Sequence, residues 1–112
     1  MRKLVVATLL AAVALPGAPA LADVKTGVDA WQRGDYKKAI SEWRGPAVAG
    51  DADAQFNLGQ AYKLGRGVPA DLAQAEEWYR KAALQGHPQA EENYGLTLFE
   101  NNKRMQGGEW LH

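Results

Sequence analysis

The chain has 112 residues, with 13 basic and 13 acidic side chains, two histidines and no cysteine. This length suits a single domain, and the balanced charge argues against a nucleic-acid-binding surface, which needs clustered basic residues. Without cysteine the chain cannot form a disulfide scaffold, a thiolate zinc site or a thiol nucleophile.

Residues 1–22 have the pattern of a secretory signal peptide. Arg2 and Lys3 precede an apolar run from residue 4 to residue 15, and the small residues Ala20 and Ala22 indicate cleavage after Ala22. The apolar run is shorter than the roughly 20 residues that cross a bilayer, so we expect no membrane anchor. No cysteine follows that would carry a lipid. The sequence therefore predicts an exported protein, in the periplasm or alternatively secreted.

From residue 23 the chain repeats itself with a period of 36 residues. This offset aligns Asp35 with Asp71, Ala39 with Ala75, Arg44 with Arg80, Gly50 with Gly86, Ala54 with Ala90, Asn57 with Asn93 and Gly59 with Gly95. Periods of roughly 20 to 50 residues are typical of stacked supersecondary units. We expect an all-α fold over residues 23–112, an α-α superhelix (solenoid) of antiparallel helical hairpins. It would contain a leading partial unit (24–49), a complete repeat (50–85) and an incomplete repeat (86–112).

In the leading unit, Gly45 and Pro46 stand where the next unit has Lys81 and Ala82. A proline inside a helix removes a hydrogen bond and clashes with the preceding turn. We therefore do not expect a straight continuation of this helix to Ala49.

The complete repeat carries clear helix signals. Asp51 or Asp53 can cap a first helix that ends at the segment Gly65–Pro69, and its apolar positions are Ala54, Leu58, Ala61 and Tyr62. Asp71 with Gln74 forms a capping box for a second helix. That helix buries Leu72, Ala75, Trp78, Tyr79, Ala82 and Ala83, and Gly86 closes it with a left-handed cap.

Gly59 and Gly95 stand inside predicted helices, where glycine costs about 1 kcal/mol relative to alanine. We interpret both as sites where paired helices cross closely, and Gly59→Leu should then unfold the array. In the incomplete repeat, Asn101–Lys103 replaces the glycine-rich loop, and Gly107–Leu111 is similar to Ala75–Tyr79 at an offset of 32 residues. The chain stops inside that second helix, so we expect a truncated array with an open apolar edge.

Residues 50–86 resemble the Sel-one-like repeat family, which is related to the tetratricopeptide repeats. The resemblance is carried by Ala54, Leu58, Gly59, Tyr62, Gly65, Gly67, Val68, Pro69, Asp71, Ala75, Trp78, Tyr79, Lys81, Ala82, Ala83, Gly86 and Ala90. Upstream, Trp31, Gly34, Asp35, Tyr36, Ala39 and Trp43 are similar to a unit with an abbreviated hairpin. In this family the first helices of the units line the concave surface that binds partners.

The sequence predicts no catalytic, cofactor-binding or metal-binding residues. His87 stands in a turn without a second ligand at metal-binding spacing, and Ser41 has no histidine or acidic residue in a nucleophile pattern. The four tryptophans stand at helical spacing and are interpreted as core residues.

The resemblance instead implies polar recognition of a protein or peptide. At the matching positions of the first helices, the residues expected to face solvent are the candidate partner-binding residues Gln55, Gln60, Lys63, Glu91 and Thr97. We therefore predict a non-catalytic adaptor or scaffold of the bacterial cell envelope. One alternative is a beta-lactam-binding or hydrolysing enzyme, as in relatives that are rich in disulfides, which this chain lacks. Another is a self-associating structural or glycan-binding module.

Overall fold

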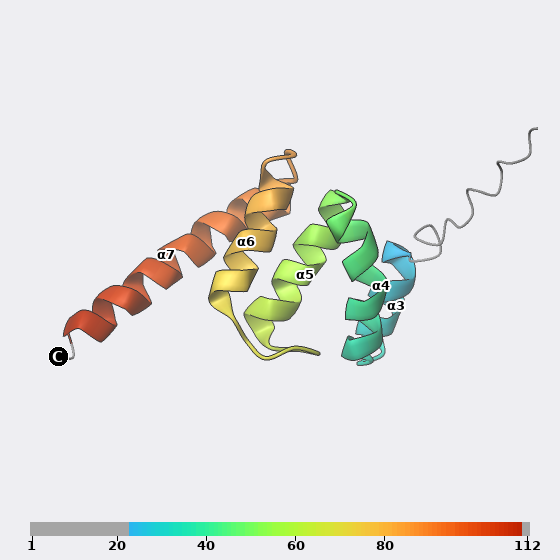
Figure 1. Cartoon of the computed structure of the whole chain (residues 1–112), viewed down its shortest axis with the longest axis horizontal. Helices are drawn as coiled ribbons and strands as arrows, with labels where there is room; N and C mark the ends of the chain where they lie inside the picture. Colours follow the sequence, from blue (N-terminus) through green and yellow to red (C-terminus); the bar gives the residue numbers. More distant parts are fainter. Residues whose placement is uncertain (1–22, 111–112) are drawn as a thin grey trace, which may run out of the picture.

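A computed structural model describes residues 23–110, with side chains up to Gln106. The predicted signal peptide lies outside the described residues, as do residues 111 and 112. Between Asp23 and Trp110 there are five helices: α3 (Val24–Gln32), α4 (Tyr36–Val48), α5 (Ala52–Leu64), α6 (Leu72–Ala83) and α7 (Pro88–Trp110). The prediction of an all-helical fold is confirmed. The helices form a row in chain order, and each makes its main contacts with the next (Figure 1).

Aspartates start the first four helices. The side chains of Asp23, Asp35, Asp51 and Asp71 each accept a hydrogen bond from a backbone N–H in the first turn, which is one of the donors that a helix leaves without a partner. Asp51 rather than Asp53 therefore caps α5. At α6 only half of the predicted capping box forms, because the Asp71 N–H donates to Tyr62 O at 2.9 Å instead of to Gln74.

The turns after α4 and α6 have the same structure, as the 36-residue period predicts. Gly50 and Gly86 adopt positive φ angles of 109° and 86°, which favour glycine. In each turn the residue after the glycine donates its N–H to a carbonyl five residues earlier, Asp51 to Pro46 and His87 to Ala82. This is the Schellman arrangement, so the left-handed cap predicted at Gly86 is confirmed.

The core consists largely of alanines, with a few large side chains between them. The hydrophobic residues that are at most 2% exposed are Ala30, Ala39, Trp43, Ala47, Ala54, Leu58, Ala61, Ala75, Tyr79, Ala82 and Ala90. Small residues at the contact faces let neighbouring helices approach closely. The described residues therefore form a thin row of helices in which each helix is buried by its neighbours along the chain.

Gly59 illustrates this close approach, whereas Gly95 does not. A Cβ atom on Gly59 would lie 2.5 Å from Tyr79 Cδ1, so the close crossing of α5 and α6 requires glycine. A Cβ on Gly95 would have no heavy atom of another element within 4 Å. The interpretation of Gly95 as a close crossing is therefore wrong, because no helix among the described residues packs on that side of α7.

Helix α4 continues through Pro46 to Val48, with Ala49 as its C-cap, so Pro46 does not interrupt the helix as the sequence predicts. Pro46 lies in the last turn, where its missing N–H costs the helix a single hydrogen bond. The preceding residue is Gly45, which has no Cβ to clash with the proline ring.

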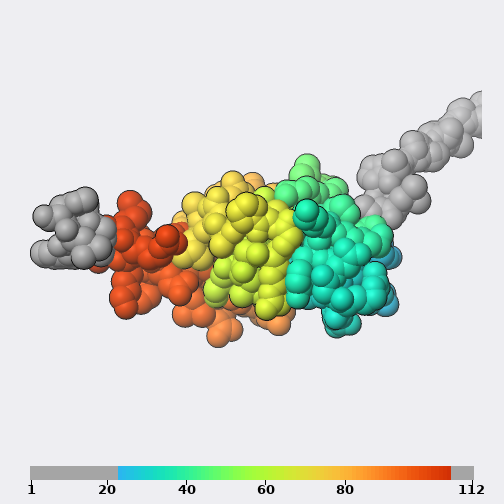
Figure 2. Space-filling view, turned by 90° about the horizontal axis from the view of Figure 1, so that it is seen from below, coloured from blue at the N-terminus to red at the C-terminus, as the bar shows by residue number. Residues whose placement is uncertain are grey.

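Helix α7 differs most from the sequence prediction. Instead of breaking at Asn101–Lys103, it runs for 23 residues to Trp110. No glycine or proline stands between residues 96 and 106 to end it, unlike the segment Gly65–Pro69 of the previous repeat. Asn101 joins the middle of α7 to α6, because its Nδ2 donates to Leu72 O at 3.2 Å and to Glu76 Oε1 at 2.7 Å. The second half of α7 projects beyond the other helices (Figure 2).

None of the described helices combines the length and the apolar character that crossing a bilayer requires.

Candidate protein-binding groove

Helices α3 and α5 enclose a hollow of about 150 Å³, which we call the α3–α5 hollow. Its walls are formed by α3 and α5, which are the first helices of two successive repeat units. Trp43 of α4 lies behind them. The lining residues are Val28, Trp31, Trp43, Phe56, Asn57, Gln60 and Leu64. The hollow therefore combines an aromatic and aliphatic wall with two amide side chains.

Trp43 and Trp31 form the aromatic base of this hollow. Trp43 is 2% exposed, and its indole Nε1 donates to Val24 O at 3.1 Å, which fixes the ring. The Trp31 ring lies 5.5 Å from the Trp43 ring and 4.8 Å from the Tyr36 ring, the latter edge to face. Gly27 lets α3 approach, since a Cβ there would collide with the Trp43 indole. Burial of Trp43 confirms its interpretation as a core residue, whereas Trp31 is half-buried and lines the hollow.

The loop between α5 and α6 brings a cation to the same region. The Arg66 guanidinium lies 5.3 Å from the Tyr36 ring centre and 6.0 Å from the Trp31 ring, and its Nη1 contacts Tyr36 Oη at 3.4 Å. A cation held over aromatic faces gains from the charge distribution of the rings. Gly67 allows the loop to lie on α4, because its Cβ would be 2.6 Å from Ile40 Cδ1.

A second hollow, of about 560 Å³, lies beside α7; we call it the α7 hollow. It is lined by Lys63, Leu72, Leu96, Phe99, Glu100, Lys103 and Arg104. Three basic side chains against one acidic side chain give its rim a positive charge. Lys63 of the α7 hollow and Leu64 of the α3–α5 hollow are neighbours at the end of α5, and we call the two hollows together the groove.

Three of the five candidate residues are accessible. Gln60 lines the α3–α5 hollow, where its Oε1 accepts a hydrogen bond from the buried Tyr79 hydroxyl. Lys63 lines the α7 hollow. Glu91 is exposed in the first turn of α7 but lines neither hollow.

The expectation that Gln55 and Thr97 face solvent is wrong. Gln55 is 5% exposed: its Nε2 donates to Ala47 O at 3.0 Å, and its Oε1 accepts from Gln85 Nε2 at 3.0 Å. Thr97 is fully buried, at the position that the period assigns to the buried Ala61. Its Oγ1 has no hydrogen-bond partner. Both residues are polar, but a polar side chain on a first helix need not face solvent.

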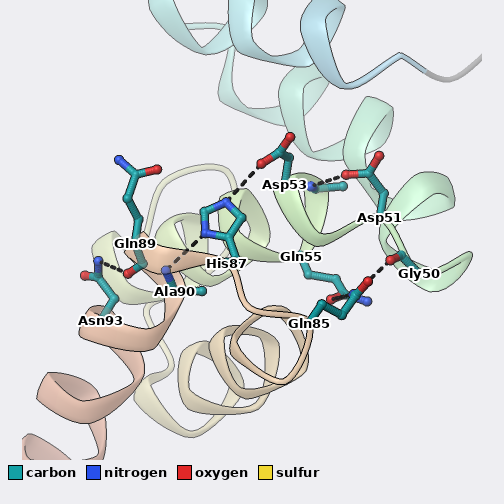
Figure 3. Close-up of polar contacts among 10 residues, drawn as sticks. Gly50, Asp51, Asp53, Gln55, Gln85, His87, Gln89, Ala90 and Asn93 are labelled. Carbon is teal, nitrogen blue, oxygen red and sulfur yellow. Dashed lines mark hydrogen bonds and ion pairs between the residues drawn. The ribbon is translucent and has the colours of Figure 1, made fainter.

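His87 has a structural role that its place in a turn did not indicate (Figure 3). Its Nδ1 accepts from the Ala90 N–H at 3.1 Å, so His87 caps the start of α7. Because Nδ1 accepts, the ring proton is on Nε2, which lies 2.9 Å from Asp53 Oδ1. The imidazole also stacks on Phe56, with ring centres 4.9 Å apart. His87 thus joins the start of α5 to the start of α7.

Gln85 makes a parallel link at the same end of the array. Its Nε2 donates to Gly50 O at 2.9 Å as well as to Gln55 (Figure 3). The turn after α4 and the turn after α6 are therefore tied together by side-chain hydrogen bonds. These contacts lie at the opposite end of α5 and α6 from the loop that connects them.

The perturbed ionisable groups lie on α6. Burial raises the pKa of the Tyr79 phenol, which stays protonated and donates to Gln60. A hydrogen bond from Arg80, with its charge and that of Lys81, lowers the pKa of the exposed Glu77 carboxyl. These contacts stabilise the helix surface and place no acid–base pair in the groove. From Asp23 to Gln106 no group of three potential metal ligands occurs.

Comparison with known proteins identifies a repeat and several relatives of this chain. The family model described as "Sel1 repeat" matches residues 52–87, which contain α5, α6 and the following turn. The alginate biosynthesis protein AlgK of Pseudomonas aeruginosa is 36% identical over 97 residues, 87% of this chain and 20% of AlgK. An F-box protein of Arabidopsis thaliana is 35% identical over 78 residues, 70% of this chain and 22% of that protein.

An exopolysaccharide production negative regulator of Rhizobium leguminosarum is 36% identical over 58 residues, 52% of this chain and 22% of the regulator. The chain thus spans about a fifth of the length of these three relatives. The matched repeat and its helical hairpin agree in position and in structure. Residues 52–87 of the chain are therefore a Sel1 repeat.

Proposed function

We propose that this chain is a non-catalytic, exported adaptor of the bacterial cell envelope that binds a segment of another protein in the groove. The observation that carries the proposal is the α3–α5 hollow, where two first helices present aromatic side chains beside Asn57 and Gln60. Apolar walls with a few placed polar groups are typical of binding pockets. The amides can bond a peptide backbone while the aromatic wall contacts its side chains.

The charge of the groove suggests what kind of segment fits. Lys63, Lys103 and Arg104 surround the α7 hollow with only Glu100 to balance them. Opposite charges across an interface favour the encounter and set its orientation. We therefore propose that the bound segment carries acidic side chains next to an apolar one.

Location in the envelope rests on the signal-peptide pattern of residues 1–22 and on the relatives. Two of the compared relatives carry names from polysaccharide biology, alginate biosynthesis and exopolysaccharide production. The chain has no cysteine, so the disulfides of the beta-lactam-binding relatives have no counterpart here. Clear turnover of nitrocefin by the purified protein would reverse this assignment.

The proposal is tested by crosslinking and pulldown from an envelope fraction, with the full chain expressed and exported as bait. Leu64 is 48% exposed and lines the groove, whereas Leu84 is 75% exposed and lies outside it. Leu64→Lys should abolish capture of the partner, and Leu84→Lys, the matched control, should leave it unchanged. Lysine is tolerated at both sites because each is at the C-terminal end of a helix.

If Leu64→Lys and Leu84→Lys captured the partner equally well, the groove would not be its binding site. Failure of the unsubstituted chain to capture any specific protein, together with binding to isolated peptidoglycan, would instead identify a glycan-binding module.

A further inference from the structure

Gln60 lines the α3–α5 hollow with its hydrogen-bonding direction set by a buried residue. Tyr79 is fully buried, so its phenol proton needs an acceptor inside the protein, and that acceptor is Gln60 Oε1. Among the described residues, the amide nitrogen of Gln60 has no hydrogen-bond partner. Gln60 therefore offers N–H donors to the hollow, while Tyr79 holds its oxygen.

The leading unit makes the equivalent link without a side-chain acceptor. The residues 36 positions before Tyr79 and Gln60 are Trp43 and Val24, and Trp43 Nε1 donates to the backbone oxygen of Val24 at 3.1 Å. Both bonds join a second helix to the first helix of its unit, but only the bond at Gln60 leaves two amide hydrogens for a ligand. A backbone oxygen would serve a purely structural link equally well.

Arg66 is the second donor at this site, and aromatic rings hold its guanidinium. It lies 5.3 Å from the centre of the Tyr36 ring and 6.0 Å from that of Trp31, which lines the hollow. Within residues 23–106 no carboxylate pairs with Arg66, so its charge is available to a partner. The acidic side chains of α3 and α4 pair with lysines of their own helices, Asp29 with Lys25 and Glu42 with Lys38.

The volume of the hollow sets the size of the group that enters it. It encloses about 150 Å³, which is the volume of a cavity that holds a benzene-sized group. Pockets for whole small-molecule ligands are larger, about 300–1,000 Å³. The lining is apolar apart from Asn57 and Gln60 and contains no charged residue. One side chain of the size of leucine or phenylalanine therefore fills the hollow.

We propose, building on the proposed function, that the α3–α5 hollow binds one large apolar side chain of the partner segment, and that Arg66 binds the carboxylate of an acidic side chain next to it. Gln60 donates to the backbone oxygen of the apolar residue. Arg66 lies nearest to Tyr36, which does not line the hollow. A carboxylate bound there stands outside the hollow, within reach of a neighbouring side chain and beyond the apolar residue's own carboxyl group. Carboxylates accept paired hydrogen bonds from a guanidinium.

Blocked tripeptides test this recognition without the natural partner. The probes are acetyl-Glu-Leu-Glu-amide, its neutral counterpart acetyl-Gln-Leu-Gln-amide, and acetyl-Glu-Ala-Glu-amide, which has a smaller central side chain. Each is titrated into the exported, isotope-labelled full chain, and the NMR signals of the Trp31 indole N–H and the Gln60 side-chain amide report binding at the hollow. The Glu-Leu-Glu peptide should bind about tenfold more tightly than either of the others, because charge-assisted hydrogen bonds are about twice as strong as neutral ones.

Substitution of Arg66 tests the charge. Arg66→Gln should reduce the affinity for the Glu-Leu-Glu peptide to that for the Gln-Leu-Gln peptide, and Arg66→Glu should favour acetyl-Lys-Leu-Lys-amide. Arg44→Gln is the matched control and should keep the preference for the Glu-Leu-Glu peptide. Arg44 also lies over an aromatic ring, 6.0 Å from the centre of Tyr62, but it lines neither hollow.

Substitution of Gln60 tests the amide donor. Gln60→Glu keeps an acceptor for Tyr79 and replaces the N–H donors by oxygen, so it should weaken the binding of the Glu-Leu-Glu and Gln-Leu-Gln peptides alike. Gln74→Glu adds the same charge at an exposed position of α6 outside both hollows, and it should weaken neither. Circular dichroism of every variant checks that the helices are retained.

Several results would overturn the proposal: equal binding of the Glu-Leu-Glu and Gln-Leu-Gln peptides, an equal loss of preference in Arg44→Gln and Arg66→Gln, or no change at Trp31 with any peptide. Tighter binding of acetyl-leucine, with its free carboxylate, would overturn it by identifying a chain terminus as the ligand. Capture of the envelope partner is measured separately. If Leu64→Lys abolished that capture while the peptides showed no charge preference, the proposed function would stand without this inference.

Discussion

Substituting Gly59 and Gly95 with alanine should change stability in opposite directions. At Gly59 the added methyl group meets the Tyr79 ring, and overpacking of this kind costs about 1–3 kcal/mol. At Gly95 the methyl group points into open space, and the better helix propensity of alanine should stabilise the chain by up to about 1 kcal/mol. Thermal unfolding of both variants measures the difference, and a loss at Gly95 as large as that at Gly59 would contradict the packing argument.

Thr97 is a second residue whose replacement should stabilise the protein. Its buried hydroxyl has no partner, and leaving such a group unsatisfied costs about 1–3 kcal/mol. Thr97→Val keeps the branched shape and removes the hydroxyl, so the midpoint of urea unfolding should increase. Thr97→Ser, which keeps the hydroxyl and loses the methyl group, should lower the midpoint. A destabilised valine variant would show that the hydroxyl has a partner in solution.

His87 should contribute to stability mainly as a helix cap. His87→Ala removes the acceptor of the Ala90 N–H, the contact with Asp53 and the stacking on Phe56. Loss of a cap alone costs about 1 kcal/mol, so the alanine variant should lose at least that much. Asparagine can accept the same hydrogen bond, and His87→Asn should recover part of the loss. Equal stability of the two variants in urea unfolding would rule out the cap as the main contribution.

At the scale of the elements, α7 has two unlike halves. The first half contains the buried residues Ala90 and Thr97 and ends at Asn101, which is hydrogen-bonded to α6, whereas residues 102–106 are all exposed. Helices without tertiary contacts are marginally stable in water. Backbone amides after residue 102 should therefore exchange with deuterium much faster than those of residues 92–100. Mass spectrometry of peptides after exchange checks this. Uniform protection along α7 would show that the whole helix is held.

The helices also show where local sequence rules succeed and where they fail. Asp51, Asp71 and Gly86 act through the backbone of their own turn, so their patterns predicted the bounds of α5 and α6 well. Pro46 and the segment Asn101–Lys103 were expected to interrupt helices and did not. A proline in a last turn breaks little, and polar residues without glycine or proline do not stop a helix.

For the molecule as a whole, the 36-residue period was enough to predict the architecture, because each helix contacts chiefly its neighbours in the chain. The site was less predictable. Gln60 and Lys63 do line the groove, but Gln55 and Thr97 are buried. Which side of a helix is covered depends on the neighbouring repeat and not on the polarity of the residue. Trp31 shows the same dependence: its helical spacing predicts a core residue, but it is half-buried and lines the groove.

The hydrogen bond between Asp23 and Glu42 would become an ion pair if the predicted signal peptide were cleaved off. The Asp23 backbone nitrogen donates to Glu42 Oε1 at 3.1 Å, and the other carboxylate oxygen of Glu42 lies 3.4 Å from Lys38 Nζ. Cleavage after Ala22 would turn this amide into a charged α-ammonium group, and the hydrogen bond would become an ion pair that joins the new chain end to α4. Partly exposed pairs of this kind contribute about 0.2–1 kcal/mol. Glu42→Gln should therefore lower the melting temperature of the cleaved protein more than that of a version with extra residues before Asp23. Cleavage after Ala22 would then also strengthen the contact between the start of α3 and α4.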